Sequence, residues 1–218
     1  MRNRFDRQLE ELHTELIEMG AMCENVISKT CTLLKTGEMA LAKEIRSEDG
    51  NIDQQEREIE SMCLKLLLQQ QPVAKDLRKI SAALKMITDM ERIGDQASDI
   101  AEIVETCQLH FSEEKIKLTQ MAETTIRMVT ESIDAYVKQD MSLVQKVIAS
   151  DDEVDDLFVE VREEITREMQ SAEVSMENSL DMLMIAKYYE RIGDHATNIA
   201  EWVEFSITGT HKDADVLL

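Results

Sequence analysis

The sequence contains a tandem repeat whose two copies are offset by 99 residues. The fifteen residues Glu91–Glu105 return as Glu190–Glu204, and eleven of the fifteen positions are identical. The offset is nearly half of the 218-residue chain. A repeat of this quality indicates one structural unit used twice. We therefore expect two similar lobes of about 100 residues each, a size that can bury a core.

The composition favours helices throughout. Six glycines, one proline, four phenylalanines, three tyrosines and one tryptophan are too few turn and strand formers for a β protein. Apolar residues recur at helical spacing almost continuously. The expected helices span residues 4–36, 38–70, 73–109, 112–138, 140–171 and 176–207. The predicted fold class is all-α: two similar antiparallel three-helix bundles formed by an internal tandem repeat. Their predicted bounds are 1–110 and 111–208, followed by a frayed tail at 209–218.

The net charge of −21 limits the partners of the chain. It argues against nucleic acid, which requires clustered lysine and arginine, and against adhesion to an anionic bilayer. No apolar run approaches the roughly 20 residues of a membrane span, and the N-terminus lacks the apolar stretch of a secretory signal. We expect a cytoplasmic protein without direct membrane insertion, which reaches a membrane only through a protein partner.

All four cysteines lie in the first half of the chain, at apolar helical positions: Cys23, Cys31, Cys63 and Cys107. Their spacings fit no zinc motif, and the second copy of the repeat lacks them. We interpret them as reduced core residues.

Acidic residues are placed symmetrically about the predicted turns. Asp49 and Asp95 are equidistant from Pro72, and so are Asp53 and Glu91. Such positions lie at the same height in an antiparallel helical hairpin, so four carboxylates should meet in the first lobe. The second lobe repeats this relation about its own turn, between residues 172 and 173, with Asp151, Asp155, Glu190 and Asp194.

Four carboxylates at close quarters destabilise a fold unless a cation lies among them. Oxygen ligands at this spacing suit hard cations such as magnesium, manganese, calcium or oxidised iron. We therefore predict that these eight residues bind metal ions in two clusters. Candidates for outer ligands are Glu24, Asp99, Glu123 and Asn198. Gly94 and Gly193 weaken their helices, and a close neighbour or an ion beside the backbone would explain them.

Three other interpretations stay open. The acids form a solvated stripe if Arg92 and Arg191 neutralise them. Both arginines lie about 100° around the helix from the glutamates, so we expect them to serve a neighbouring face. A metal-free helical adaptor would use the acidic stripes to bind a basic partner surface. A carboxylate-bridged di-iron oxidase would need Glu-x-x-His motifs on two helices, which the sequence does not supply. Metal content after purification without chelators separates these alternatives.

At its two Glu-Arg-Ile-Gly-Asp signatures the chain resembles the PhoU family of phosphate-regulon regulators. The resemblance extends to the segments Phe5–Glu10 and Gln71–Arg78 and covers essentially the whole chain. It implies two similar three-helix bundles. Several members carry metal clusters, iron or zinc among them, on the acidic motifs that correspond here to Asp49/Asp53, Glu91/Asp95, Asp151/Asp155 and Glu190/Asp194.

The resemblance also implies a role without catalysis. Proteins of this kind repress phosphate-starvation signalling and bridge a phosphate ABC transporter and a sensor histidine kinase. The expected partners are therefore the ATPase subunit of the transporter and the kinase, and a homodimer stays open. The sequence shows no nucleophile–base pair or phosphate-binding loop that would indicate an enzyme.

Overall fold

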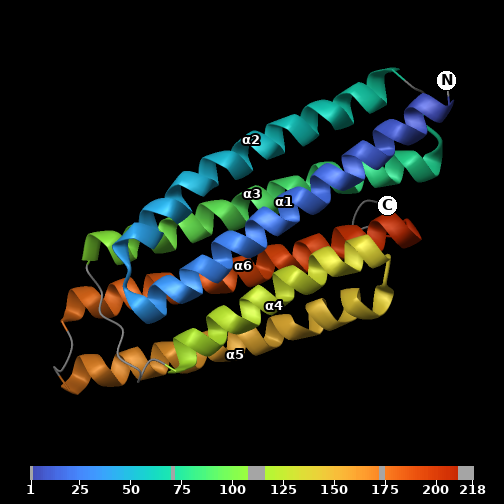
Figure 1. The fold of residues 1–218 in the computed structure, drawn as a ribbon. Coiled ribbons are helices and arrows are strands. Elements are labelled where there is room, and N and C mark those ends of the chain that lie inside the picture. Colours follow the sequence, from blue (N-terminus) through green and yellow to red (C-terminus); the bar gives the residue numbers. More distant parts are fainter. Residues whose placement is uncertain (1, 70–71, 108–115, 172–174, 211–218) are drawn as a thin grey trace.

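The computed structural model describes residues 2–69, 72–107, 116–171 and 175–210. These ranges contain six helices and no strand (Figure 1): α1 (Arg2–Thr36), α2 (Met39–Gln69), α3 (Ala74–Cys107), α4 (Ile116–Lys138), α5 (Met141–Ser171) and α6 (Met176–Thr208). The all-α prediction is confirmed, and the described helix ends fall within a few residues of the expected ones. None of these helices is both long and apolar enough to cross a membrane.

Residues at the helix ends explain where the helices begin and stop. Gly37 follows α1 with a φ of 65° and Gly209 follows α6 with a φ of 82°, in the left-handed region that glycine adopts without steric cost. Ser175 precedes α6, and its side chain accepts a hydrogen bond from the Asn178 amide over 3.1 Å. This N-cap satisfies one of the free amides of the first turn.

The six helices form a central four-helix layer with one further helix on each side. Within each half the three helices pack as antiparallel neighbours, α1–α2–α3 and α4–α5–α6. The halves meet along two long contacts, α3 against α6 and α1 against α4, so α1, α3, α6 and α4 form a closed ring. Helix α2 lies outside on α1 and α3, and α5 lies outside on α4 and α6 (Figure 1).

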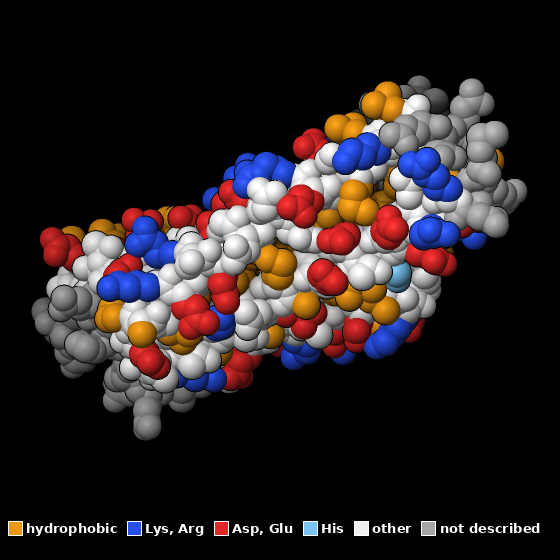
Figure 2. Space-filling model, turned by 45° about the horizontal axis from the view of Figure 1, so that its top comes forward, with side chains coloured by type: hydrophobic (Ala, Val, Ile, Leu, Met, Phe, Trp, Pro, Cys, Tyr) orange, Lys and Arg blue, Asp and Glu red, His pale blue; other side chains and the backbone are white. Residues whose placement is uncertain are grey.

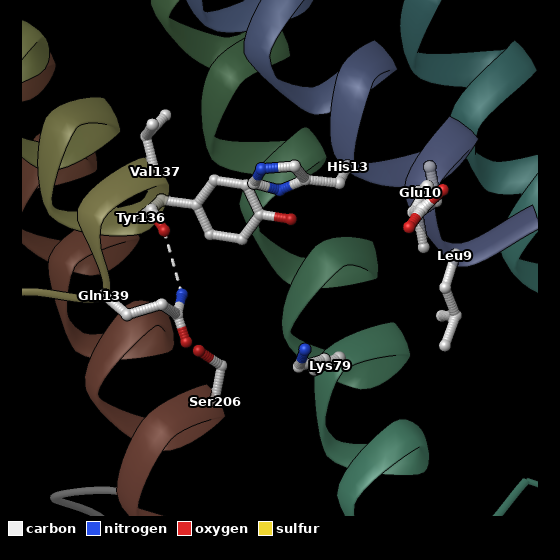
Figure 3. A pocket seen from close by; sticks show the side chains of 9 residues that line it. Leu9, Glu10, His13, Lys79, Tyr136, Val137, Gln139 and Ser206 are labelled. Carbon is white, nitrogen blue, oxygen red and sulfur yellow. Dashed lines mark hydrogen bonds between the residues drawn. The ribbon is translucent and has the colours of Figure 1, made fainter. Parts of the chain in front are cut away.

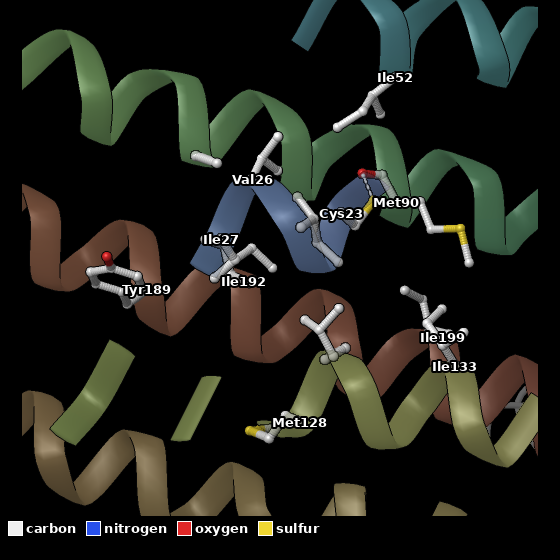
Figure 4. Close-up of a cluster of buried hydrophobic side chains, with 14 of the residues drawn as sticks. Cys23, Val26, Ile27, Ile52, Met90, Met128, Ile133, Tyr189, Ile192 and Ile199 are labelled. Atoms are coloured by element: carbon white, nitrogen blue, oxygen red, sulfur yellow. Dashed lines mark hydrogen bonds between the residues drawn. The ribbon is translucent and has the colours of Figure 1, made fainter. Parts of the chain in front are cut away.

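A single hydrophobic core runs through this central layer (Figure 4). Cys23 and Ile27 of α1, Met90 of α3 and Ile192 of α6 are buried in it together. Tyr189 of α6 is also fully buried, and its hydroxyl donates to Thr30 Oγ1 of α1 over 2.9 Å. The two predicted bundles therefore share one interior.

Three of the four cysteines confirm the interpretation as reduced core residues. Cys23, Cys31 and Cys63 are free and buried, whereas Cys107 is free and half-buried at the end of α3. The predicted boundary at residue 110 and residues 211–218 of the predicted tail lie outside the described residues. The division into units 1–110 and 111–208 stays a prediction.

Candidate metal centres

The first hairpin brings three carboxylates together beside α3. Asp49 and Asp53 lie one turn apart on α2, and Asp95 faces them from α3. One oxygen of each lies within 4.8 Å of the other two. Glu91 stands one turn before Asp95. Burial, followed by the charges of Asp95, Glu56 and Asp53, raises the pKa of its carboxyl, although the charge of Arg92 opposes the change. This is the juxtaposition that the symmetry about Pro72 predicts, and the acidic group could hold a metal ion.

Asp49 is the most confined carboxylate of this group. Its Oδ1 is buried and has no hydrogen-bond partner among the described residues. Burial, followed by the charges of Asp95 and Asp53, raises the pKa of Asp49 from 3.8 to about 6, although hydrogen bonding from Ser98 opposes the change. A buried carboxylate oxygen without a donor is destabilising unless a proton or a cation satisfies it. The donor set therefore fits a hard cation.

Gly94 allows α2 to approach α3 at this point. A Cβ atom there would lie 3.1 Å from Asp49 Oδ1 and 3.0 Å from Ile52 Cδ1, closer than ordinary van der Waals contact. At Gly193, the equivalent position, the nearest atom would be Val154 Cγ1 at 3.4 Å. The expected close approach is thus present at Gly94, and the second half is more open.

Arg92 contacts the first acidic group, which corrects the expectation that it serves a neighbouring face. Its Nη1 lies 2.8 Å from Asp95 Oδ2 and its Nε lies 3.3 Å from Glu91 Oε2. Arg57 Nη1 lies 3.8 Å from Asp53 Oδ2. The long arginine side chain bends back along its helix, which position on the helix alone does not reveal. Asp49 has no such ion pair among the described residues.

The equivalent group of the second half is looser. It comprises Asp151, Asp155, Glu190 and Asp194. The pKa of Asp194 is raised by burial and then by the charges of the other three, so the four lie near one another. Within the described ranges, only the first-half group brings three ligand atoms within 4.8 Å. Lys187 forms an ion pair with Glu190, and Thr197 Oγ1 donates to Asp151 Oδ1 over 3.2 Å. These contacts occupy oxygens that a metal would need.

Glu24 and Glu123, two of the candidate outer ligands, lie at the contact between α1 and α4. Glu24 faces Thr130 and Asp134 of α4. Burial of its carboxyl raises its pKa, and hydrogen bonding from Thr130 opposes the change. Glu123 pairs with Lys35 of α1 over 2.8 Å. These two acids therefore join the halves across the central layer.

Asp99 and Asn198 lie at the other contact between the halves. Asn198 Nδ2 donates to Asp89 Oδ1 of α3 over 3.1 Å, and His195 Nδ1 lies 2.9 Å from the same oxygen. Asp99 faces Tyr188 of α6, and burial raises the pKa of Asp99. Asp89 and Tyr188 occupy the same place in the two copies, as do Asp99 and Asn198. Asp89 was not recognisable from the sequence because its counterpart, Tyr188, is not acidic.

A cavity of about 300 Å³ lies at one end of the central layer (Figure 3). Its lining comes from all four central helices: Leu9, Glu10, Leu12, His13, Lys79, Tyr136, Val137, Gln139 and Ser206. The rings of His13 and Tyr136 are 5.1 Å apart, and burial, followed by the charge of Lys79, lowers the pKa of His13. Sequence periodicity could not locate this cavity because it forms only where the halves meet.

A family model for the PhoU domain matches the chain twice, over residues 16–104 and 118–203. The phosphate-specific transport system accessory protein PhoU homolog of Clostridium acetobutylicum is 35% identical over 96% of this chain and 96% of that protein. The accessory protein PhoU of Escherichia coli is 28% identical over 94% of this chain and 86% of that protein. These relatives are named as accessory proteins and not as enzymes, which confirms the expectation of a non-enzymatic protein.

Two solved structures share the fold along their whole length. The crystal structure of PhoU from Pseudomonas aeruginosa matches with a TM-score of 0.90 and 31% identity, covering 94% of this chain and 100% of that one. The phosphate transport system regulatory protein PhoU from Streptococcus pneumoniae matches with a TM-score of 0.87 and 28% identity, covering 96% and 99%. The doubled domain, the six-helix architecture and the full-length relatives together show that the chain belongs to the PhoU family.

Proposed function

We propose that this protein is a non-enzymatic, metal-binding regulator of phosphate uptake and phosphate-starvation signalling. It acts as a negative regulator of the phosphate regulon and links a phosphate ABC transporter, through its ATPase subunit, to a sensor histidine kinase. The observation that carries the regulatory role is similarity along nearly the whole chain to accessory proteins of phosphate-specific transport. The role implies a cytoplasmic protein whose partners, the transporter and the kinase, lie at the membrane.

A deletion strain tests the regulatory role. Loss of the protein should derepress phosphate-uptake genes in phosphate-rich medium, and a plasmid copy should restore repression. Pull-downs from membranes should recover the transporter ATPase or the kinase. Unchanged expression of these genes in the deletion strain would contradict the proposed function and leave the structural conclusions in place.

The metal proposal rests on the unpartnered Asp49 oxygen inside a group of acids that outnumber their arginines. The proposed ligands are Asp49, Asp53, Glu91 and Asp95 in the first half and Asp151, Asp155, Glu190 and Asp194 in the second. Iron, zinc, manganese and magnesium are the candidate ions. Because, among the described residues, three ligand oxygens come within 4.8 Å of one another only in the first group, the second group should bind a metal ion more weakly.

Elemental analysis of protein purified without chelators tests this proposal. The variant Asp49→Asn should lower the metal content, and Asp151→Asn, at the equivalent position of the second half, should lower it less. Protein that contains no metal and does not bind any of the four candidate ions in a titration would support the metal-free adaptor instead. Ion pairs of Arg92 and Arg57 with the first group are the observation that favours this alternative.

The di-iron oxidase has little support in the structure. The chain contains one Glu-x-x-His motif, Glu10 to His13, and both residues line the end cavity on α1. The carboxylate groups lie on α2, α3, α5 and α6. Oxygen consumption by iron-loaded protein with a reductant would revive this hypothesis.

A further inference from the structure

Two hairpin tips expose large apolar side chains. The first tip comprises the described residues of 60–80, where α2 ends and α3 begins, and the second comprises those of 162–179, where α5 ends and α6 begins. On the first tip Leu64, Leu68, Val73 and Leu77 are exposed, with Leu68 at 86% and Val73 at 61%. On the second tip Met169 and Met176 are exposed. Exposed apolar clusters of this kind usually mark a contact surface.

The two tips carry opposite charge. The described residues of the first tip include four basic and two acidic side chains: Lys65, Lys75, Arg78, Lys79, Glu60 and Asp76. Those of the second tip include two basic and four acidic ones: Arg162, Arg167, Glu163, Glu164, Glu168 and Glu177. In a chain with a net charge of −21, the first tip is therefore an unusual basic region.

The start of helix α1 lies beside the first tip. Gln8 and Glu11 of α1 line one groove with Lys65 of α2, so the start of α1 lies against the end of α2. Arg4 and Arg7 at the start of α1 are exposed, and so are the acidic Asp6, Glu10 and Glu11, so the excess of positive charge belongs to the residues of the tip itself. Figure 2 shows lysine, arginine and hydrophobic side chains at this end of the molecule, with acidic side chains between them. Within the described part of the chain, neither Lys65 nor Lys75 forms an ion pair.

We propose that the first tip docks on the surface of an anionic lipid bilayer. Basic side chains are attracted to anionic headgroups, and adjacent apolar side chains enter the headgroup boundary. The projection of Leu68 and Val73 from the surface suits a fluid interface, which needs no pocket of matching shape. The second tip presents apolar side chains with the opposite charge and does not dock.

The negative charge of the whole chain does not oppose this contact at physiological ionic strength. Asp49, in the first acidic group, lies 19 residues before Leu68 on the same helix, a distance of roughly 30 Å at the rise of an α-helix. Exposed charges are largely screened beyond about 8 Å at physiological salt. The bilayer therefore senses the charge of the tip and not the sum over the molecule.

Vesicle co-sedimentation of the purified full chain tests the proposal. The chain should bind vesicles of phosphatidylcholine that contain phosphatidylglycerol, and binding should weaken with salt and be absent for phosphatidylcholine alone. Lys65→Glu should weaken partitioning on the order of 20-fold, because each unit of charge near such a surface changes it about fivefold. Arg167→Glu, the equivalent change on the second tip, should leave it unchanged.

A second matched pair tests the apolar contribution. Leu77→Glu should reduce binding, whereas Met176→Glu at the equivalent position should not, and circular dichroism should show that all four variants fold. Equal binding by Lys65→Glu and the unchanged chain would overturn the proposal. Absence of binding to either vesicle would also overturn it and leave an acidic protein as the occupant of the tip. The assay contains only protein and lipid, so its outcome is independent of the proposed role in phosphate regulation.

Discussion

The surroundings of Asp49 make its ionisation unfavourable in the folded chain without metal. Its pKa lies near 6 when folded, against 3.8 as the ordinary value. Between about pH 4 and pH 6, Asp49 is therefore mostly protonated in the folded state and mostly ionised in the unfolded state. By linkage, this group contributes stability at low pH that is lost as the pH rises through 6.

The variant Asp49→Asn should accordingly be more stable than the unchanged chain at pH 7 in the presence of chelator. The two proteins should converge toward pH 3, where Asp49 is largely protonated in both states. Urea unfolding at the two pH values measures the difference. With metal bound the order should reverse at pH 7, because a cation requires the ionised carboxylate. A stability gain that is independent of pH would contradict this account.

The two glycines of the repeated signature should respond differently to alanine. Gly193→Ala should stabilise the protein by up to about 1 kcal/mol through helix propensity, because its Cβ meets only ordinary contacts. Gly94→Ala gains the same propensity but crowds Ile52 and Asp49, and overpacking costs about 1–3 kcal/mol.

Thermal and urea unfolding of both variants measure this difference, and metal titration shows whether Gly94→Ala displaces Asp49. Equal stabilities and equal metal affinities would mean that α2 shifts to accommodate the added methyl group.

At the residue scale the sequence predicted which acidic side chains meet but not which basic side chains form ion pairs with them. Equidistance from Pro72 depends only on the path of the backbone through the hairpin. Asp49 and Asp95 therefore face each other in the folded chain, as predicted. Arg92 and Lys187 have long side chains whose direction depends on rotamers and on neighbouring charges. Their ion pairs therefore became visible only in the structure.

Helices α3 and α6 are held in register by polar contacts inside a largely apolar interface. Asp89→Ala would leave the side chains of His195 and Asn198 without their shared acceptor. Leaving part-buried donors unsatisfied costs about 1–3 kcal/mol. Thr88→Ala, one residue earlier on the exposed face of α3, should change the stability by less than about 0.5 kcal/mol. Chemical denaturation of the two variants compares them, and equal effects would show that water replaces Asp89 at no cost.

The helices themselves were predictable, whereas their pairing across the two copies was not. Continuous 3.6-residue periodicity and the glycine at the end of α1 define the elements locally. A hairpin relates only the two helices that its turn connects. Nothing in the sequence brought α1 to α4 or α3 to α6, so the contacts of Glu24 with α4 and of Asn198 with α3 were not predicted.

For the whole molecule, bound metal should act as a structural component. Removing it leaves the first acidic group with mutually repelling charges next to the shared core. The chelated protein should therefore melt at a lower temperature than the metal-loaded protein at pH 7 and matched ionic strength. The difference should shrink toward pH 4 as protons replace the cation. Identical melting curves in differential scanning calorimetry would argue that the ion, if bound, is not structural.

The crossed contacts of α3 and α6 bear on how the two copies diverged after duplication. Asp89 meets Asn198, and Tyr188, its counterpart, meets Asp99. A symmetric pair of first copies would instead set Asp89 against Asp99 twice, placing four carboxylates at one seam. A symmetric pair of second copies would set Tyr188 against Asn198 and lose the acids of both contacts. Each copy therefore makes contacts that fit only the other copy. A gene encoding the first copy twice should not yield a protein with the same contacts between its halves.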